Sequence, residues 1–306
     1  MSEVFHQGEQ AVQVMAGEEK VAARVGRMIK SKINGGAFNF IQKQAMAFIT
    51  SSDEHSKVWV SLLVGEEGFI KVPDEGQVVF DLSKLRSTDK DLLFKNIKIE
   101  SQVGVLFIEP ISRLRFRVNG KATLLGDELK VQAAEAYGNC PKYIQRQHIS
   151  LPDAQDKAQA YTSTGEQLKT EHLDWVKQAD TFYMGTKSLD GQSDASHRGG
   201  NPGFIEVLED MTLRIPDYPG NSLFQSLGNI HEQPNTGLLF VDFQKGTCLQ
   251  LSGKATLEFN QQTPEELKKT ATTGRFWRFE TEAWVLTQHH HQVDWEFVDF
   301  SPFNPD

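Results

Sequence analysis

The pentapeptide Gly120-Lys121-Ala122-Thr123-Leu124 recurs unchanged as Gly253-Lys254-Ala255-Thr256-Leu257, at an offset of 133 residues. Four other blocks recur in the same order, at offsets of 133 to 135: residues 48–52 with 182–186, 68–72 with 203–207, 96–97 with 229–230, and 104–107 with 237–240. A nearly constant offset across five separated blocks indicates an internal duplication of the chain.

Each repeat is expected to consist mainly of strands. In residues 113–121 apolar side chains occupy positions 114, 116 and 118, and polar side chains occupy the odd-numbered positions. This alternation predicts a half-buried strand, and residues 248–257 show it again. Gly120 and Gly253 fall where such a strand must bend, as at a barrel corner. The sequence therefore predicts a mainly β protein with peripheral helices, built from two small barrels in tandem.

Short helices are predicted at 127–136, 171–178 and 222–233, and apolar residues at positions 14, 21, 25 and 28 predict a helical arm that packs on a barrel. The expected domains are residues 1–36 as the N-terminal helical arm, 37–126 as the first barrel with a degenerate site, 127–178 as a helical connection, and 179–306 as the second barrel with the phosphate site.

Charge and composition exclude several classes of function. With 41 acidic and 32 basic residues the formal net charge is −9, which disfavours a nucleic-acid partner. No apolar run reaches the roughly 18 residues of a membrane span, and the first twenty residues lack the pattern of a signal peptide. Cys140 and Cys248 are the only cysteines and lack the paired spacing of a zinc site. We expect a cytoplasmic protein without a membrane partner.

The second repeat is polar where the first is apolar. Residues 193–202 offer a hydroxyl, an imidazole and a guanidinium, whereas residues 58–64 of the first repeat are mostly apolar, with Leu63 in the place of Arg198. Residues 220–222 precede a predicted helix, whose free N–H groups favour an anion. The pattern indicates one anion site. The alternatives are a surface ion pair for Arg198 and an ordinary turn and helix cap at 220–222.

Six blocks in order carry a resemblance to a known family: residues 5–9 (FHQGE), 115–122 (RFRVNGKA), 138–144 (GNCPKYI), 196–204, 215–217 and 220–222. Together they span nearly the whole chain, which resembles the two-barrel branch of the pyridoxamine 5'-phosphate oxidase-related FMN-binding split-barrel family. The resemblance implies two tandem FMN-binding split β-barrels that form a pseudo-dimer within one chain. It also implies that FMN lies in the groove between the barrels.

The resemblance implies a cofactor site built by both barrels, with Arg115 and Arg117 from the first and Ser196, His197, Arg198, Pro216, Asp217, Asn221, Ser222 and Gln225 from the second. Arg198 would hold the flavin phosphate together with Asn221 or Ser222. Arg115 and Arg117 would reach across the groove, and the alternative for them is an exposed face paired with acidic residues. No catalytic residue is assigned.

The expected function is that of an FMN-dependent oxidoreductase, which passes a hydride or electrons from a reduced nicotinamide to an unknown small molecule. Gln225 and Ser226 replace the basic pair of the vitamin B6 oxidases, which argues against pyridoxamine phosphate as the substrate. The alternatives are a non-enzymatic protein that binds or senses flavin or haem, with His197 or His231 as the haem ligand, and a structural partner without a cofactor. A homodimer of the chain also stays open.

Two further groups receive structural interpretations. Consecutive strand residues point to alternate faces, so His289, His290 and His291 are expected in a solvated strand or turn, and no metal site is predicted. Cys140 has no neighbouring histidine or second cysteine and is expected to be a buried structural residue. Hydrolase and nucleoside triphosphatase functions are excluded because the chain has no nucleophile elbow and no Walker-type phosphate loop.

Overall fold

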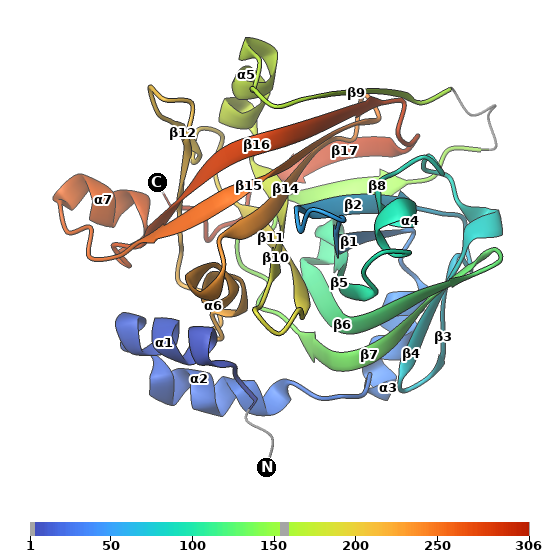
Figure 1. Ribbon diagram of the computed structural model, residues 1–306, viewed down its shortest axis with the longest axis horizontal. Helices are drawn as coiled ribbons and strands as arrows, with labels where there is room; N and C mark the ends of the chain where they lie inside the picture. The colour runs from blue at the N-terminus through green and yellow to red at the C-terminus, as the bar shows by residue number, and fades with distance from the viewer. Residues whose placement is uncertain (1–3, 154–158, 306) are drawn as a thin grey trace.

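The computed structural model describes residues 4–153 and 159–305, and it contains two large antiparallel sheets with the same strand order (Figure 1). The order is β2-β1-β5-β6-β7-β4-β3 in the first sheet and β11-β10-β14-β15-β16-β13-β12 in the second. Every strand of the first sheet thus has a counterpart at the same place in the second. This match confirms the duplication and the predicted fold of two tandem split β-barrels.

The strands of the first sheet are β1 Met46–Ser52, β2 Val58–Val64, β3 Ile70–Asp74, β4 Gln77–Asp81, β5 Gln102–Glu109, β6 Leu114–Leu125 and β7 Glu128–Gly138. Those of the second are β10 Thr181–Lys187, β11 Ser193–Gly199, β12 Glu206–Val207, β13 Leu213–Pro216, β14 Asn235–Asp242, β15 Thr247–Glu258 and β16 Phe276–Gln288, with β9 Tyr161–Gly165 added beside β16. Outside both barrels, β8 Arg146–Ser150 pairs with β17 Asp294–Asp299.

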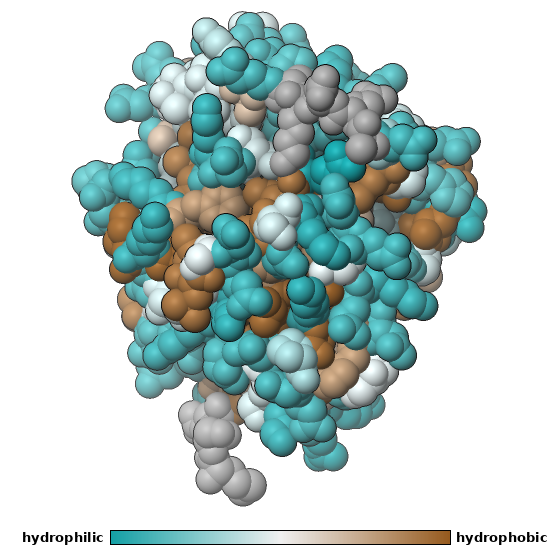
Figure 2. Space-filling view, turned by 90° about the vertical axis from the view of Figure 1, so that its right-hand side faces the viewer, coloured by the Kyte–Doolittle hydropathy of each residue, from teal (hydrophilic) through white to brown (hydrophobic). Residues whose placement is uncertain are grey.

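The helices are α1 Gln7–Ala16, α2 Glu19–Val25, α3 Gly35–Gln42, α4 Leu93–Asn96, α5 Thr170–Gln178, α6 Gln225–Glu232 and α7 Pro264–Lys269, with short 3₁₀ turns at Gly26–Met28, Leu82–Lys84 and Pro110–Ser112. No helix in the described part of the chain has the length and apolar character needed to cross a bilayer. The face of the molecule on the first-barrel side shows apolar residues interspersed among hydrophilic ones (Figure 2).

Strand register relates the two repeats residue by residue. Thr50 pairs with Gly104 in the first sheet, and Gly185 pairs with Gly237 in the second. Because Gly104 and Gly237 are equivalent, Thr50 corresponds to Gly185, at an offset of 135. In the structure, residues 48–52 therefore correspond to residues 183–187, one position later than the sequence comparison matched them.

The same register makes Phe48 the counterpart of Tyr183, and these two rings stack with centroids 3.4 Å apart. A contact between equivalent residues marks the pseudo-twofold axis. The register also confirms that Leu63 stands in the place of Arg198, since they pair with the equivalent residues Ala47 and Phe182.

The barrels meet through close backbone contacts. A Cβ atom on Gly104 would lie 2.6 Å from the backbone of Asp194 and Ala195, and one on Gly237 would lie 2.5 Å from the carbonyl oxygen of Val58. Strand β5 thus packs against β11, and β14 packs in the same way against β2. Each barrel has its own apolar core, and a third cluster that includes Phe48, Leu106, Tyr183 and Leu239 lies between them.

One predicted helix is wrong. Residues 127–136 form most of strand β7, in which Leu129 and Val131 are buried and Lys130 is partly exposed. This period of two, together with a tight turn at Gly126 (φ 57°), favours a hairpin with β6. The first sheet therefore continues past the predicted boundary at 126. Residues 154–158 of the predicted connection lie outside the described residues.

Two predicted helices and the arm are confirmed as helical. Helix α5 lies where residues 171–178 predict it, and α6 begins three residues later than the predicted start at 222. In the arm, the predicted apolar face is wrong, because Val14 and Val21 are exposed and Val12 and Ala22 are buried. Gly17 adopts a left-handed conformation and ends α1, so the spacing from 14 to 28 spans two helices.

The strand predicted at 113–121 is confirmed as part of β6, but it is not half-buried. Phe116 and Val118 enter the first core as predicted, whereas Leu114 is exposed. Arg117 and Asn119, on the polar face, are also buried. They are buried because that face lies against the second barrel, which a single-strand pattern does not reveal.

Replacing Gly104 with alanine is expected to lower the free energy of unfolding by about 1–3 kcal/mol, since the new methyl group overpacks the backbone of β11. Gly138→Ala is the matched control, because a Cβ atom there meets nothing within 4 Å. Urea denaturation of both variants checks this. Equal stability of the two variants would contradict the close approach of the barrels.

The buried Glu9 carboxyl is expected to make stability depend on pH. Helix α1 crosses α6 where Gly8 meets Gly228, and this contact buries the Glu9 carboxyl. Burial, aided by the negative charges of Glu135 and Asp194, raises the pKa of Glu9 from 4.5 to about 8. Between pH 4.5 and about 8, the folded protein therefore keeps a proton on Glu9 that the unfolded chain releases. Its free energy of unfolding should fall as the pH rises between these two values, by at most about 1.4 kcal/mol per pH unit from this group.

Glu9→Gln should flatten that slope, because glutamine does not titrate. Denaturant midpoints measured across the interval from about pH 5 to pH 8 test the expectation. Glu19→Gln, at an exposed position of the next helix, should keep the wild-type slope. A Glu9→Gln variant with the wild-type slope would contradict the assignment.

Candidate functional site

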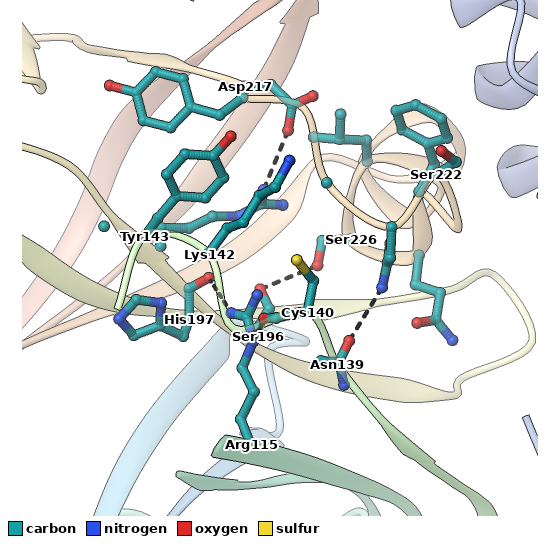
Figure 3. A pocket seen from close by; sticks show the side chains of 18 of the residues that line it. Arg115, Asn139, Cys140, Lys142, Tyr143, Ser196, His197, Asp217, Ser222 and Ser226 are labelled. Atoms are coloured by element: carbon teal, nitrogen blue, oxygen red, sulfur yellow. Dashed lines mark hydrogen bonds and ion pairs between the residues drawn. The ribbon is translucent and has the colours of Figure 1, made fainter. Parts of the chain in front are cut away.

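A cleft between the two barrels is lined by all ten residues that the sequence analysis selects: Arg115, Arg117, Ser196, His197, Arg198, Pro216, Asp217, Asn221, Ser222 and Gln225. Figure 3 labels five of them, Arg115, Ser196, His197, Asp217 and Ser222. Strand β6 of the first barrel supplies Arg115 and Arg117. Strands β11 and β13, the segment that follows β13, and helix α6 supply the others. The structure therefore brings the predicted set together, and their individual contacts differ in ways described next.

Arg115 is a cation without a carboxylate partner among the described residues. Its Nε donates to the carbonyl oxygen of Cys140 at 2.7 Å, and its Nη1 lies 3.4 Å from the carbonyl oxygen of His197. Figure 3 shows its side chain rising from β6 toward Ser196 and His197. Removal from solvent lowers the pKa of Arg115 to about 9, with smaller contributions from the charges of Arg117 and Arg198. An anion beside the Arg115 guanidinium would offset the cost of its burial and the repulsion from Arg117 and Arg198.

Arg117 has a different role. Its Nη1 lies 2.7 Å from Oδ1 of Asp194, in a fully buried ion pair between the barrels. The same nitrogen donates to the hydroxyl oxygen of Tyr137 at 2.9 Å and to Oε1 of Gln225 at 3.0 Å. Of the two arginines predicted to reach across the groove, Arg117 thus has an acidic partner, while Arg115 has only backbone carbonyl partners among the described residues.

Asp217 holds two arginines at the opposite wall. Its two oxygens accept from Nη1 of Arg198 at 3.1 Å and from Nε of Arg275 at 3.0 Å. Arg275 also donates to Glu18 of the N-terminal arm at 2.9 Å. The predicted ion-pair alternative for Arg198 is therefore present. Even so, its Nε is buried without a hydrogen-bond partner among the described residues.

The start of α6 differs from the prediction. Ser222 and Phe224 both have left-handed backbone conformations (φ 63° and 58°), so the helix begins only at Gln225. The Ser222 hydroxyl donates to Glu18 at 2.5 Å, and Oδ1 of Asn221 accepts from the Leu223 amide at 3.1 Å. Phe224, the N-cap residue, makes no side-chain hydrogen bond to the helix. The N–H groups at the start of α6, which borders the cleft, therefore donate no hydrogen bond to the N-cap side chain.

Strand β11 contributes Ser196 and His197, and β13 ends at Pro216. The Ser196 hydroxyl oxygen lies 3.1 Å from that of Ser226, which donates to Asp194. Burial, with the charges of Arg115 and Arg198, holds the pKa of His197 well below its usual value, so the ring is neutral. His231, the other histidine considered for haem, is exposed and does not line the cleft.

Sequence reasoning missed several lining residues: Asn139, Lys142, Tyr143, Tyr218 and Arg275. Asn139, Lys142 and Tyr143 belong to the block at 138–144, which carried the resemblance but was given no role. Arg275 lies far along the chain and no local pattern marks it. Cys140 is half-buried and also lines the cleft, so its assignment as a buried structural residue is wrong. Figure 3 shows Lys142 extending toward Asp217.

The expectation for the three consecutive histidines is also wrong for two of them. Residues 289–291 follow the end of β16, and His289 has a left-handed backbone conformation (φ 53°). His289 is exposed, but His290 and His291 are buried with exposed fractions of 1% and 2%. The turn brings their Nδ1 atoms to 3.3 Å from one another, an arrangement that a regular strand would not allow.

No family model and no curated protein matches the chain. Among solved structures, HupZ of Group A Streptococcus is similar at 17% identity over 38% of this chain and 90% of its own, with a TM-score of 0.30. A Clostridium acetobutylicum protein related to general stress protein 26, of the pyridoxinephosphate oxidase family, is similar at 14% over 42% and 92%, with a TM-score of 0.29. A FAD-binding protein from Mesorhizobium loti is similar at 12% over 42% and 98%, with a TM-score of 0.29.

Arg117→Gln is expected to lower the free energy of unfolding by about 3 kcal/mol, because it leaves the Asp194 carboxylate buried without its partner. Thermal or urea denaturation measures the loss. Lys95→Gln removes a solvent-exposed ion pair with Glu54 and should leave stability close to that of the wild type. Similar losses in both variants would contradict a structural role for the Arg117–Asp194 pair.

Proposed function

We propose that the cleft binds FMN and that the protein is an FMN-dependent oxidoreductase related to pyridoxamine 5'-phosphate oxidase. The observation that carries the proposal is Arg115, a largely enclosed cation without a carboxylate partner among the described residues, in a cleft that also borders the start of α6. Guanidinium groups and free backbone N–H groups at a helix start are the donors that phosphate prefers.

The donor set fits the phosphate of a flavin mononucleotide. Arg115 and Arg198 would bind it, and the first amides of α6 would add hydrogen bonds. The unpartnered Nε of Arg198 is a buried donor that an anion oxygen would satisfy. Asp217 would keep Arg198 and Arg275 oriented, because it accepts from both.

The other lining residues suit the uncharged part of the cofactor. Asn139, Ser196 and the buried Nδ1 of His197 offer hydrogen-bonding atoms to ribityl hydroxyls or ring heteroatoms. FMN, when bound, supplies the two-electron redox chemistry, while the protein orients it and limits solvent access. Lys142, which also lines the cleft, would attract an anionic donor such as a reduced nicotinamide dinucleotide.

His197 favours a second candidate, a non-enzymatic protein that binds flavin or haem. Its ring is buried and neutral, and its Nδ1 has no partner among the described residues, which are features of a haem ligand. An absorbance spectrum of the purified protein separates the candidates. Flavin bands with FMN released on heating support the proposal, and a Soret band supports haem. A colourless protein that takes up neither would contradict both.

Turnover distinguishes an enzyme from a binder. Protein loaded with FMN should oxidise NADH or NADPH in the presence of a small electron acceptor, and its flavin absorbance should bleach when the nicotinamide is added without air. If neither nicotinamide is oxidised in the presence of the acceptor and the flavin absorbance does not bleach without air, flavin binding stands but the oxidoreductase part of the proposal is contradicted.

Arg115→Met and Arg198→Met should each weaken FMN binding by roughly 2–3 kcal/mol, or about 30- to 150-fold in Kd, because each removes a charge-assisted hydrogen bond to phosphate. Quenching of flavin fluorescence measures Kd. Leu63→Ala, at the position of the first barrel equivalent to Arg198, should lower stability and leave Kd unchanged. An equal loss of affinity in the Leu63 variant would contradict a site confined to this cleft.

A further inference from the structure

The cleft lined by Arg115, Arg117, Arg198 and Arg275 is called the arginine cleft below. A second cluster of polar side chains lies away from it. Cys248 is on β15, and His290 and His291 are in the turn after β16. All three are buried, with exposed fractions of 1%, 1% and 2%. Their sulfur and ring nitrogen atoms lie within 4.8 Å of one another. Thiolate sulfur and imidazole nitrogen are both ligands that zinc binds in proteins.

The spacing of these atoms resembles that of ligands around one ion. Nδ1 of His290 lies 3.3 Å from Nδ1 of His291, and Sγ of Cys248 lies 4.0 Å from the latter. Around a tetrahedral zinc ion, bond lengths of about 2.05 Å to nitrogen and 2.3 Å to sulfur place two nitrogens roughly 3.3 Å apart and sulfur roughly 3.6 Å from nitrogen. The nitrogens already have this separation, and the sulfur would move by only a few tenths of an ångström.

Asp91 orients the cluster. Its Oδ2 lies 3.4 Å from Nε2 of His290, and its Oδ1 accepts from the Ser61 hydroxyl at 2.5 Å and from the Leu93 amide at 2.9 Å. A carboxylate beside Nε2 favours the proton on that nitrogen, which leaves the lone pair of Nδ1 directed at His291. This carboxylate–histidine arrangement is common behind metal ligands.

His291 lacks a partner on its other side. Its Nε2 is buried without a hydrogen bond among the described residues, so protonation of Nε2 would leave the Nδ1 lone pair facing that of His290. A cation between the two rings would resolve this opposition. A proton held by His290 Nδ1 would also resolve it, and the two cases differ in whether the protein takes up metal.

The location follows from the duplication. Cys248 is the counterpart of Arg115 in the β6 and β15 alignment, and Ser61 is the counterpart of Ser196 in the β2 and β11 alignment. The pseudo-twofold symmetry gives the barrels two equivalent junctions. The arginine cleft lies at one of them, and this cluster lies at the other. There, the Cys248 thiol stands at the position of the Arg115 guanidinium.

We propose that Cys248, His290 and His291 bind a divalent transition metal ion of the zinc type, with Asp91 as a positioning residue. Three protein ligands leave a fourth tetrahedral position. His290 and His291 border a surface cleft with Ser87 and Thr88, which provides a path for the ion and for a solvent ligand. The proposal does not depend on the flavin site.

Cobalt substitution tests it in the whole protein, prepared without a histidine tag and with its natural metal content first measured by mass spectrometry. Co²⁺ added to chelator-treated protein should bind one ion per chain and give a thiolate-to-cobalt absorption band in the near ultraviolet. A difference spectrum against the same protein without Co²⁺ cancels any flavin absorption. Zinc should displace the cobalt and remove the band.

The variants assign the ligands. Cys248→Ser should abolish the band, and His291→Gln should weaken Co²⁺ binding at least tenfold, whereas Cys140→Ser and His289→Gln should keep the wild-type cobalt band and Co²⁺ affinity. Asp91→Asn should keep the band with a lower affinity, which supplies a readout if Cys248→Ser fails to fold by circular dichroism. Folded wild-type protein without a thiolate band, or a band that survives in Cys248→Ser, would overturn the proposal. Flavin binding can persist in either case, so the two proposals fail separately.

Discussion

The close approach of the two barrels at Gly104 and Gly237 is the constraint on which the rest of the molecule depends. Only a residue without a side chain lets β5 reach the backbone of β11, and the equivalent glycine does the same for β14 and β2. This contact places Arg117 against Asp194 and turns the polar face of β6 inward. The arginine cleft is therefore a product of how the barrels meet, and neither barrel contains it alone.

Within that cleft, three arginines have carboxylate partners and one has none among the described residues. Asp194 forms an ion pair with Arg117, and Asp217 forms ion pairs with both Arg198 and Arg275. Glu18 of the N-terminal arm forms a second ion pair with Arg275. Arg115 has no such carboxylate among the described residues. The protein has an overall charge of −9, so a local excess of positive charge in this cleft stands out from the field of the rest of the molecule.

Much of this could be predicted from the sequence. The unchanged pentapeptide at 120–124 and 253–257 reveals the duplication, because a bulged strand in each barrel requires the same glycine. The predicted site residues do gather in one cleft, but their pairing could not be predicted, since Glu18 and Arg275 come from distant segments that no local pattern connects. The helix predicted at 127–136 is wrong because these residues follow a period of two and pair with β6. The predicted solvent exposure is wrong for His290 and His291, because the turn after β16 buries both rings and no local pattern marks that burial.

The stacked pair Phe48 and Tyr183 carries a broader consequence. In a dimer of identical chains, a residue on the twofold axis meets its own copy, and every substitution appears in both halves at once. Fusion of the halves into one chain removes that restriction, so a phenylalanine can face a tyrosine. The same freedom allows an arginine in one half to correspond to a cysteine in the other. Covalent linkage thus lets a symmetric scaffold place chemically unlike side chains at its two equivalent junctions.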